Sequence, residues 1–220
     1  VANQIAIHAA RNGHAGLIVS LEESPEGIGL RAISNRGHLS LARLRSGKIG
    51  LEEVTAVVRE HGMLDYRLWI DTRTFDLTAI AARITQYARR HRIEFAVVDH
   101  IGLVRVLAKG TRRYEQIGEV TRTLKQLAMQ LNIAVVALVQ VGRDSEKEYR
   151  RPMLSDQRES GNIEQDLNVC IAMHPKSTDD VTGRVNLEIG LLKNRYGPRA
   201  WLTQQFVFDG AVQELRERST

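Results

Sequence analysis

Short apolar runs alternate with longer amphipathic stretches over about the first 140 residues, and this alternation constrains the fold more than any other feature of the sequence. Four runs have the length of strands, at 15–19, 67–71, 94–99 and 133–139. Between them, stretches such as 77–91 and 114–131 repeat apolar residues at the spacing of a helix. Strands separated mostly by helices indicate a parallel sheet with both faces covered. The sequence therefore predicts an α/β fold, with a mostly parallel central sheet and helices on both of its faces.

Further helices are predicted outside these segments, at 2–11, 39–45 and 51–61. Another helix is expected to begin at Ser24-Pro25-Glu26. There the serine caps the helix, the proline fits its first turn, and the glutamate lies at the positive end of the helix dipole.

The pattern changes after residue 166. The apolar run 167–172 predicts one more buried strand, and the segments 184–193 and 201–208 alternate in polarity. Tyr196-Gly197-Pro198 is a turn signal between these two segments, so we expect an antiparallel hairpin on the edge of the sheet. Neither a repeat nor a linker is visible, which favours a single domain over residues 1–220.

The charge of the chain permits a polyanionic partner. The net charge is +5 and the pI about 9.6. Arginines cluster at 89–92, 112–113 and 150–151, either to bind phosphates or as solvated helix faces and loop tips. Aromatic residues make up only 5% of the chain, which favours contacts to backbone phosphates over stacking on bases.

Cysteine content and hydropathy bear on the cellular compartment. Cys170 is the only cysteine and lies in an apolar run, which indicates a buried side chain and excludes an internal disulfide. No run approaches the roughly 20 apolar residues that span a bilayer, and the first residues do not resemble a signal peptide. We expect a cytoplasmic globular domain without a membrane partner.

Two acids follow apolar strands. Asp99 ends the run 94–99, and Glu22 follows the run 15–19. Because ligands of open α/β sheets bind beyond the carboxyl ends of strands, these acids are candidates for one site. One would lie near a metal and the other would polarise an attacking water. The alternatives are a strand-ending turn for Asp99 and a helix-start acid for Glu22.

Three further polar residues lie at strand ends. Gln140 ends the run 133–139 and has an amide that suits hydrogen bonds to a phosphate or its water; otherwise it is a solvent-facing strand end. Lys193 and Arg195 are two residues apart on a predicted strand, so they would project to one face. Two parallel cations suit the charge that develops on a transferring phosphoryl group, and the alternative is an ordinary basic hairpin tip.

A polar segment, SDQRESGNIEQD at 155–166, lies between two predicted strands, where loops often carry function. Together with SLE at 20–22, VVD at 97–99, VVALVQ at 135–140 and KNR at 193–195, it resembles the RecA-fold motor domain of DnaB-type replicative helicases, over residues 1–208. The resemblance implies a RecA-like P-loop NTPase fold and an ATP-dependent DNA helicase that uses ATP, or another NTP, with Mg²⁺.

The resemblance also implies roles for single residues. Glu22 resembles the catalytic glutamate, Asp99 the acid that binds Mg²⁺, usually through water, and Gln140 the γ-phosphate sensor. Lys193 and Arg195 resemble the lysine and arginine finger that act on a neighbouring subunit's nucleotide.

Partners follow from the same resemblance. Arg158, Glu159 and Gly161 resemble members of the loop that faces single-stranded DNA, and Arg113 matches a basic position near the first central loop. The family implies a homo-oligomer, with a hexameric ring in the intact protein. Primase and a helicase loader are further expected partners.

The sequence departs from the family in three places. His100-Ile101-Gly102-Leu103 replaces the usual Tyr-Leu-Gln-Leu, and Val139 replaces a serine, which indicates a divergent branch such as that of a phage. No G-x-x-x-x-G-K-[ST] occurs, although this phosphate-binding loop normally precedes the helix expected at 2–11. We therefore expect a domain truncated just after that loop, without the N-terminal domain, that binds ATP poorly and does not hydrolyse it alone.

Two alternatives stay open on the sequence. One is a recombinase-type RecA-fold ATPase, although the 155–166 segment and the KNR pair argue against it. The other is a non-catalytic remnant of the fold that serves in oligomerisation or DNA binding.

Overall fold

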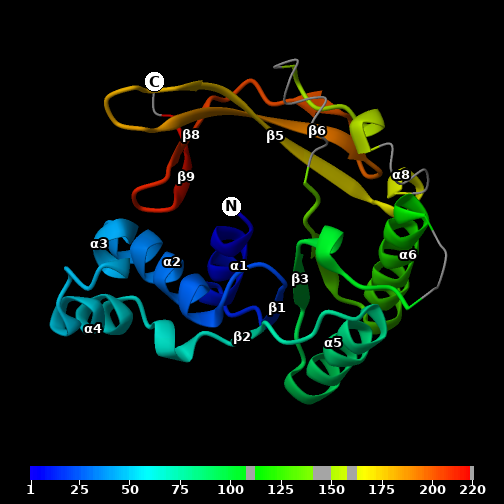
Figure 1. The fold of residues 1–220 in the computed structure, drawn as a ribbon, viewed down its shortest axis with the longest axis horizontal. Helices are drawn as coiled ribbons and strands as arrows, with labels where there is room; N and C mark the ends of the chain where they lie inside the picture. Colours follow the sequence, from blue (N-terminus) through cyan, green and yellow to red (C-terminus); the bar gives the residue numbers. More distant parts are fainter. Residues whose placement is uncertain (108–111, 141–149, 158–162, 219–220) are drawn as a thin grey trace.

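A four-stranded parallel sheet forms the centre of the first part of the chain (Figure 1). The structure, a computed structural model, describes residues 1–107, 112–140, 150–157 and 163–218. The strands are β1 (Gly16–Ser20), β2 (Leu68–Asp71), β3 (Phe95–Asp99) and β4 (Ala134–Ala137), in the order β2-β1-β3-β4. All three pairings in this sheet are parallel. The predicted parallel sheet is thus confirmed, with each strand end within two residues of its expected place.

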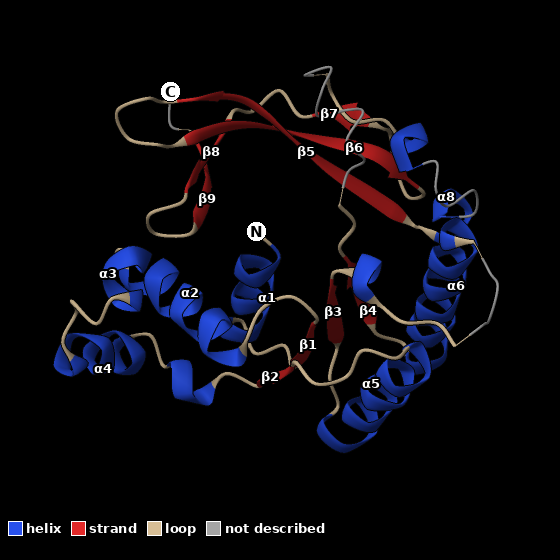
Figure 2. Cartoon of the chain, viewed as in Figure 1, coloured by secondary structure: helices blue, strands red, loops and turns tan. Residues whose placement is uncertain are grey.

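Helices cover both faces of this sheet, as Figure 2 shows. α1 (Ala2–Arg11) and α2 (Pro25–Gly37) cover one face, and α5 (Leu77–His91) and α6 (Arg113–Leu131) cover the other. α3 (Leu41–Arg45) and α4 (Leu51–Glu60) pack on α2, and the short α8 (Ile163–Asp166) packs on α6. Single 3-10 turns lie at Met63–Asp65, Ile101–Leu103 and Leu154–Gln157. The predicted cap of α2 is present, since the Ser24 side chain accepts a hydrogen bond from the Gly27 backbone N–H at 3.2 Å.

Alternate side chains of the central strands enter two different cores. On one face, strand residues pack with α5 and α6: Leu17, Val19, Ala96, Val98, Ile80 and Leu124. On the other face, strand residues pack with α1 and α2: Ile18, Phe95, Val97, Ala6 and Ile28. Burying one large apolar side chain contributes about 1.5–3 kcal/mol, so β1 and β3 are stabilised from both sides.

A second, antiparallel sheet follows, and it corrects two predictions. Its strands are β5 (Val169–Thr178), β6 (Val185–Asn194), β7 (Ala200–Trp201), β8 (Phe206–Asp209) and β9 (Glu214–Glu217), in the order β5-β6-β8-β9 with β7 on β6. The expected antiparallel pairing of 184–193 with 201–208 is confirmed, since β6 pairs with β7 and β8. Its expected place on the edge of the parallel sheet is wrong, because in the described residues these strands form a sheet of their own. β6 forms its longest pairing with β5. The sequence does not predict this pairing, because alternating polarity identifies a strand with two different faces but does not specify which strand lies beside it.

The strand expected at 167–172 is also different from the prediction. It begins at Val169, runs to Thr178 and is not buried throughout. Cys170 and Ala172 are buried, whereas the side chain of Ile171 between them is 60% exposed. Buried and exposed residues alternate in this way along a strand of an antiparallel sheet when one face of the sheet is packed and the other is in contact with solvent.

The last strands return to the N-terminal helices (Figure 1). The side-chain amide of Gln4 on α1 both donates to the carbonyl and accepts from the N–H of Leu215 on β9, each at 2.8 Å. The Leu41 N–H, at the start of α3, donates to the Ala211 carbonyl at 2.8 Å. Gln4 also lines the cavity described next. Within the described residues, no helix is long and apolar enough to cross a membrane.

Candidate active site

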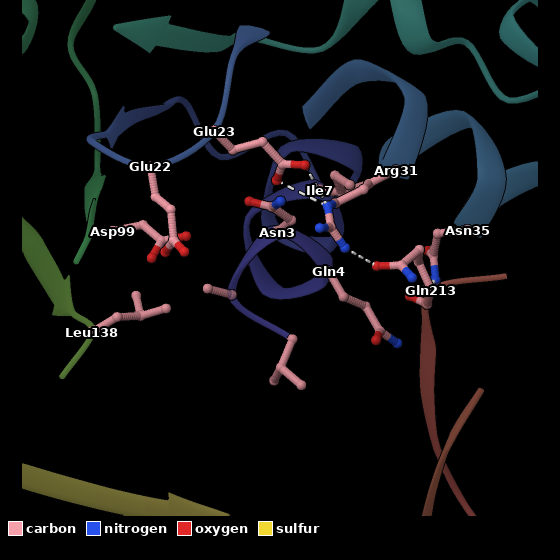
Figure 3. A pocket seen from close by; sticks show the side chains of 12 residues that line it. Asn3, Gln4, Ile7, Glu22, Glu23, Arg31, Asn35, Asp99, Leu138 and Gln213 are labelled. Atoms are coloured by element: carbon pink, nitrogen blue, oxygen red, sulfur yellow. Dashed lines mark hydrogen bonds and ion pairs between the residues drawn. The ribbon is translucent and has the colours of Figure 1, made fainter. Parts of the chain in front are cut away.

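A cavity of about 380 Å³ lies at the carboxyl end of the parallel strands (Figure 3). Its walls come from the ends of β1 and β3, the first residues of α1, one face of α2 and the turn before β9. Polar side chains from these elements line it, among them Asn3, Gln4, Glu22, Asp99, Arg31 and Gln213. This is the position where an open α/β sheet places its ligand.

Glu22 and Asp99 meet in this cavity because of the strand register. Ser20 pairs with Asp99 in the β1–β3 ladder, and the Leu21 N–H donates to the Asp99 carbonyl at 2.7 Å. Figure 3 shows both carboxylates directed into the same part of the cavity. Burial raises the pKa of Asp99 above its usual value, and the nearby Glu22 carboxylate raises it further. The sequence prediction that these two acids share a site is therefore consistent with the geometry.

Neither of these carboxylates forms an ion pair within the described part of the chain. Glu23, the next residue after Glu22, is different. The Arg31 Nε donates to both of its carboxylate oxygens at 2.8 Å, and an Arg45 nitrogen lies 3.3 Å from one of them. Among the described residues, one acid of the cavity is thus held in ion pairs and the other two are not.

The alternative of Glu22 as a helix-start acid does not fit this geometry. The cap of α2 is Ser24, and the acid in its first turn is Glu26. Glu22 lies before the helix and lines the cavity.

Sequence reasoning missed the α2 side of the cavity. Arg31 and Asn35 lie four residues apart and therefore share one face of α2. Arg31 donates to the side-chain oxygen of Gln213, and the Asn35 side chain donates to the Gln213 carbonyl at 3.0 Å. Gln213 is 178 residues from Asn35 in the sequence, so no local pattern could have revealed this contact.

The carboxylate oxygens that line the cavity suit a hydrated divalent cation that also binds a phosphate group. Mg²⁺ prefers oxygen, retains several waters and is held by one or two carboxylates together with substrate phosphates. The described residues contain no group of three or more metal-ligating side chains. The first residues of the ten-residue helix α1 also line the cavity, and free N–H groups at a helix N-terminus favour anions.

Comparison with known proteins decides the family. The sequence-family model of the DnaB-like helicase C terminal domain matches residues 1–217 of this chain. The chain belongs to this family. Among its curated relatives is the replicative DNA helicase DnaB of Rickettsia felis, 35% identical over 158 residues, which are 70% of this chain and 32% of that protein. A probable plasmid replicative DNA helicase of Chlamydia muridarum is 35% identical over 200 residues, which are 90% of this chain and 42% of the relative.

Solved structures support the fold of this DnaB-like domain. One solved ATPase domain has a TM-score of 0.84 at 22% identity, covering 99% of this chain and 79% of that one. A DnaB-like replicative helicase, solved to show its interactions with primase, also has a TM-score of 0.84, at 21% identity, covering 97% and 53%. The predicted RecA-like α/β fold is therefore confirmed. The domain spans less than half the length of each of the two curated relatives.

The remaining nucleotide-site predictions lie outside the cavity of this DnaB-like domain. Gln140 is exposed beyond the end of β4, two residues after Leu138, which does line the cavity. Lys193 is near the end of β6, where its ammonium donates to the Glu164 carbonyl. Arg195 is exposed just beyond that strand, and its N–H donates to the Asn168 carbonyl at 2.8 Å. Figure 1 shows this end of β6 close to α8.

The predicted DNA contacts are described only in part. Arg158, Glu159 and Gly161 lie outside the described residues of the DnaB-like domain. Arg113 begins α6 and is exposed. Its guanidinium donates to the Gly102 carbonyl, which holds the start of α6 against the turn that follows β3.

Proposed function

We propose that this domain is the ATP-hydrolysing motor of a replicative DNA helicase. One observation carries the proposal: Glu22 and Asp99 converge, without an ion pair among the described residues, on a cavity that the N-terminus of α1 also lines. Membership of the DnaB-like helicase family supports it. The proposed substrate is ATP or another nucleoside triphosphate bound with Mg²⁺.

In the proposed reaction, α1 directs its free N–H groups toward the phosphates. Asp99 would hold Mg²⁺ through the ion's water ligands, in the family's manner, and the ion when bound would supply positive charge for the phosphate oxygens. Glu22 orients the attacking water and accepts its proton. Arg31 holds the Glu23 carboxylate, so that Glu22 is the acid in the turn after β1 that stays available.

A second copy of the chain supplies the rest of the proposed site. Lys193 and Arg195 do not line the cavity of their own chain. As finger residues they would reach the nucleotide of a neighbour, which requires a homo-oligomer such as a hexameric ring. Gln140, beyond β4, would sense the γ-phosphate and lead into the segment that follows it.

Single-stranded DNA is the proposed track of the motor. The net charge of +5 and the exposed Arg113 favour phosphate contacts. Arg158, Glu159 and Gly161 are the proposed loop contacts. Primase and a loader are proposed partners, and a similar structure is described with its interactions with primase. A helicase that unwinds chromosomal or phage DNA would be located in the cytoplasm.

ATP hydrolysis and duplex unwinding by the full-length gene product test this proposal. Glu22→Gln should lower kcat by on the order of 10²- to 10⁴-fold, as loss of a general base does, while nucleotide binding persists. Glu26→Gln is the matched control: it removes an exposed acid outside the cavity and should leave kcat within about twofold. A wild-type protein that binds DNA but hydrolyses no ATP would support a non-catalytic remnant of the fold.

A further inference from the structure

The turn 210–213, between β8 and β9, docks onto α2 at the edge of the proposed nucleotide cavity. Gln213 ends this turn with a φ of 57°, in the left-handed region that few residues other than glycine adopt. Three hydrogen bonds hold it there: its carbonyl accepts from Asn35 at 3.0 Å, its amide donates to the Gly210 carbonyl at 2.6 Å, and its side-chain oxygen accepts from Arg31. Residues in such conformations persist where their surroundings over-determine them.

Arg31 connects this turn to the strand end that carries Glu22. Its Nε donates to both oxygens of Glu23 at 2.8 Å, while another nitrogen of the same guanidinium donates to Gln213. The guanidinium is planar and rigid, so both partners are held in one fixed geometry. The pair is partly shielded, since the Arg31 and Glu23 side chains are 33% and 22% exposed. It should therefore contribute more than an ion pair in open solvent.

Holding Glu23 also fixes the backbone next to Glu22. The Glu23 N–H donates to the Ser20 hydroxyl at 3.1 Å, and that hydroxyl donates to the Glu23 carbonyl at 3.0 Å. Ser20 itself is in the β1–β3 ladder opposite Asp99. The two residues between these anchors, Leu21 and Glu22, have little freedom, so the position of Glu22 depends on the contact that restrains Glu23.

We propose that Arg31 is a positioning residue, which sets the place of Glu22 according to how the turn 210–213 is seated on α2. This inference rests on the proposed function. Arg31 acts through Glu23 and does not itself take part in proton transfer. Its role is therefore distinct from the roles proposed for Glu22 and Asp99.

The same contact joins the cavity to the strand with the predicted finger residues. β9 pairs with β8. β8 in turn pairs with the first residues of β6, where Val185 of β6 lies opposite Phe208 of β8. β6 is ten residues long and spans roughly 30 Å, at about 3.3 Å per residue, before it reaches Lys193 and Asn194 at its other end. One hydrogen-bonded sheet therefore runs from the Arg31 contact to the finger, so a shift of the finger strand would be felt at Glu22.

Kinetics of four variants of the full-length gene product test the positioning role. Arg31→Met keeps the aliphatic stem and removes both contacts, Gln213→Met removes only the turn side, and the double variant combines them. Arg45→Met is the matched control, because Arg45 also pairs with Glu23 but forms no hydrogen bond or ion pair with the turn 210–213 among the described residues. ATP turnover, the KM for MgATP and the Tm are measured for each variant.

Arg31→Met should lower kcat about tenfold, equivalent to ~1.4 kcal/mol, with KM changed by less than about threefold. Gln213→Met should lower kcat by a smaller factor, and the double variant should be no slower than Arg31→Met, because Gln213 acts through Arg31. Arg45→Met should stay within about twofold of wild type. Effects of Arg31→Met and Gln213→Met that multiply in kcat, or that appear only in Tm, would overturn the proposal.

Hydrogen exchange supplies a readout that needs no hydrolysis. Arg31→Met should increase amide exchange in two segments, 20–24 and 210–215, whereas Arg45→Met should leave the second unchanged. An increase in only one segment with Arg31→Met would show that Arg31 does not join them. An inactive wild type would refute the proposed hydrolysis and leave the exchange result to judge the contact, so the two failures are distinguishable.

Discussion

Replacing Asp99 with asparagine should make the protein more stable and less active. The side chain is half-buried, forms no ion pair in the described residues, and faces the Glu22 carboxylate. Asparagine keeps the shape and removes the charge that burial and repulsion disfavour. The same change removes the proposed holder of the Mg²⁺ waters, so ATP hydrolysis should fall by on the order of 10²-fold.

The gain in stability should be small. Solvent screens a half-exposed charge, and exposed charge pairs contribute about 0.2–1 kcal/mol, so relief of this repulsion should contribute about 0.5–1 kcal/mol. In a chain of 220 residues that corresponds to a rise in Tm of roughly 1–4 °C.

The sign of the pH dependence follows from the raised pKa of Asp99, caused first by burial and then by Glu22. The folded protein binds this proton more tightly than the unfolded chain. Its contribution to stability is fully present below the unfolded pKa and is lost as pH rises through the folded pKa. The advantage of Asp99→Asn should therefore be largest near pH 7 and shrink toward about pH 4.

Thermal unfolding of the full-length gene product without nucleotide or Mg²⁺, between pH 4 and 8, measures this. Glu23→Gln is the matched control, because Glu23 lies in the same cavity but is paired with Arg31 and Arg45. Its loss should cost about 1–2 kcal/mol, as for a partly shielded charge-assisted bond. A lower Tm for Asp99→Asn at pH 7, or a higher one for Glu23→Gln, would refute the view that Glu23 is held in ion pairs and that Asp99, among the described residues, is not.

Three more predictions concern the finger, the DNA loop and the sheet. Arg195→Ala should abolish hydrolysis and spare nucleotide binding, and mixing it with Glu22→Ala should restore part of the activity, because mixed rings contain intact interfaces; no recovery at any ratio would count against a shared site. Arg158→Ala should reduce the slope of log affinity for single-stranded DNA against log salt by about 0.7, equally on two unrelated oligonucleotides, as expected for one lost phosphate contact; an unchanged slope would remove this loop from the DNA path. Asp71→Ala should lower the free energy of unfolding by roughly 2–3 kcal/mol in urea titrations, because the buried carboxylate accepts from the Arg73 N–H and the Thr74 hydroxyl, each at 2.9 Å, and pairs with Arg83 at 2.7 Å; a loss below about 0.5 kcal/mol would contradict that sum.

The parallel half of the fold could be predicted from sequence because its signals are local. Buried strands are continuous apolar runs, and helices such as α5 (Leu77–His91) repeat apolar residues at helical spacing. The antiparallel half could be predicted only in part: the turn signal between β6 and β8 indicates their pairing, whereas the pairing of β5 with β6 is a choice between distant segments. The polar residues Lys176, Ser177 and Thr178 resemble a loop, yet they extend β5. Alternation shows that a strand has two faces and leaves its partner open.

The same distinction applies to the site. Glu22 and Asp99 could be found because parallel strands end at one edge of a sheet, so acids that follow them converge. Arg31 and Gln213 could not, because their contact exists only once the turn 210–213 has packed on α2. The roles of Gln140, Lys193 and Arg195 stay predictions, since a neighbouring chain would have to complete the site.

The ladder between β1 and β3 has a consequence for how such a domain can change over evolutionary time. Ser20 lies opposite Asp99 through backbone hydrogen bonds, which do not depend on which apolar side chains fill the two cores. Substitutions that preserve volume can therefore accumulate on both faces without moving the acids. A single inserted residue in either strand would instead shift the register and turn every later side chain to the opposite face. Divergence should thus be tolerated as substitution in the strands and as length variation in the connections, which is a physical reason that 22% identity to a solved ATPase domain is enough to retain its fold.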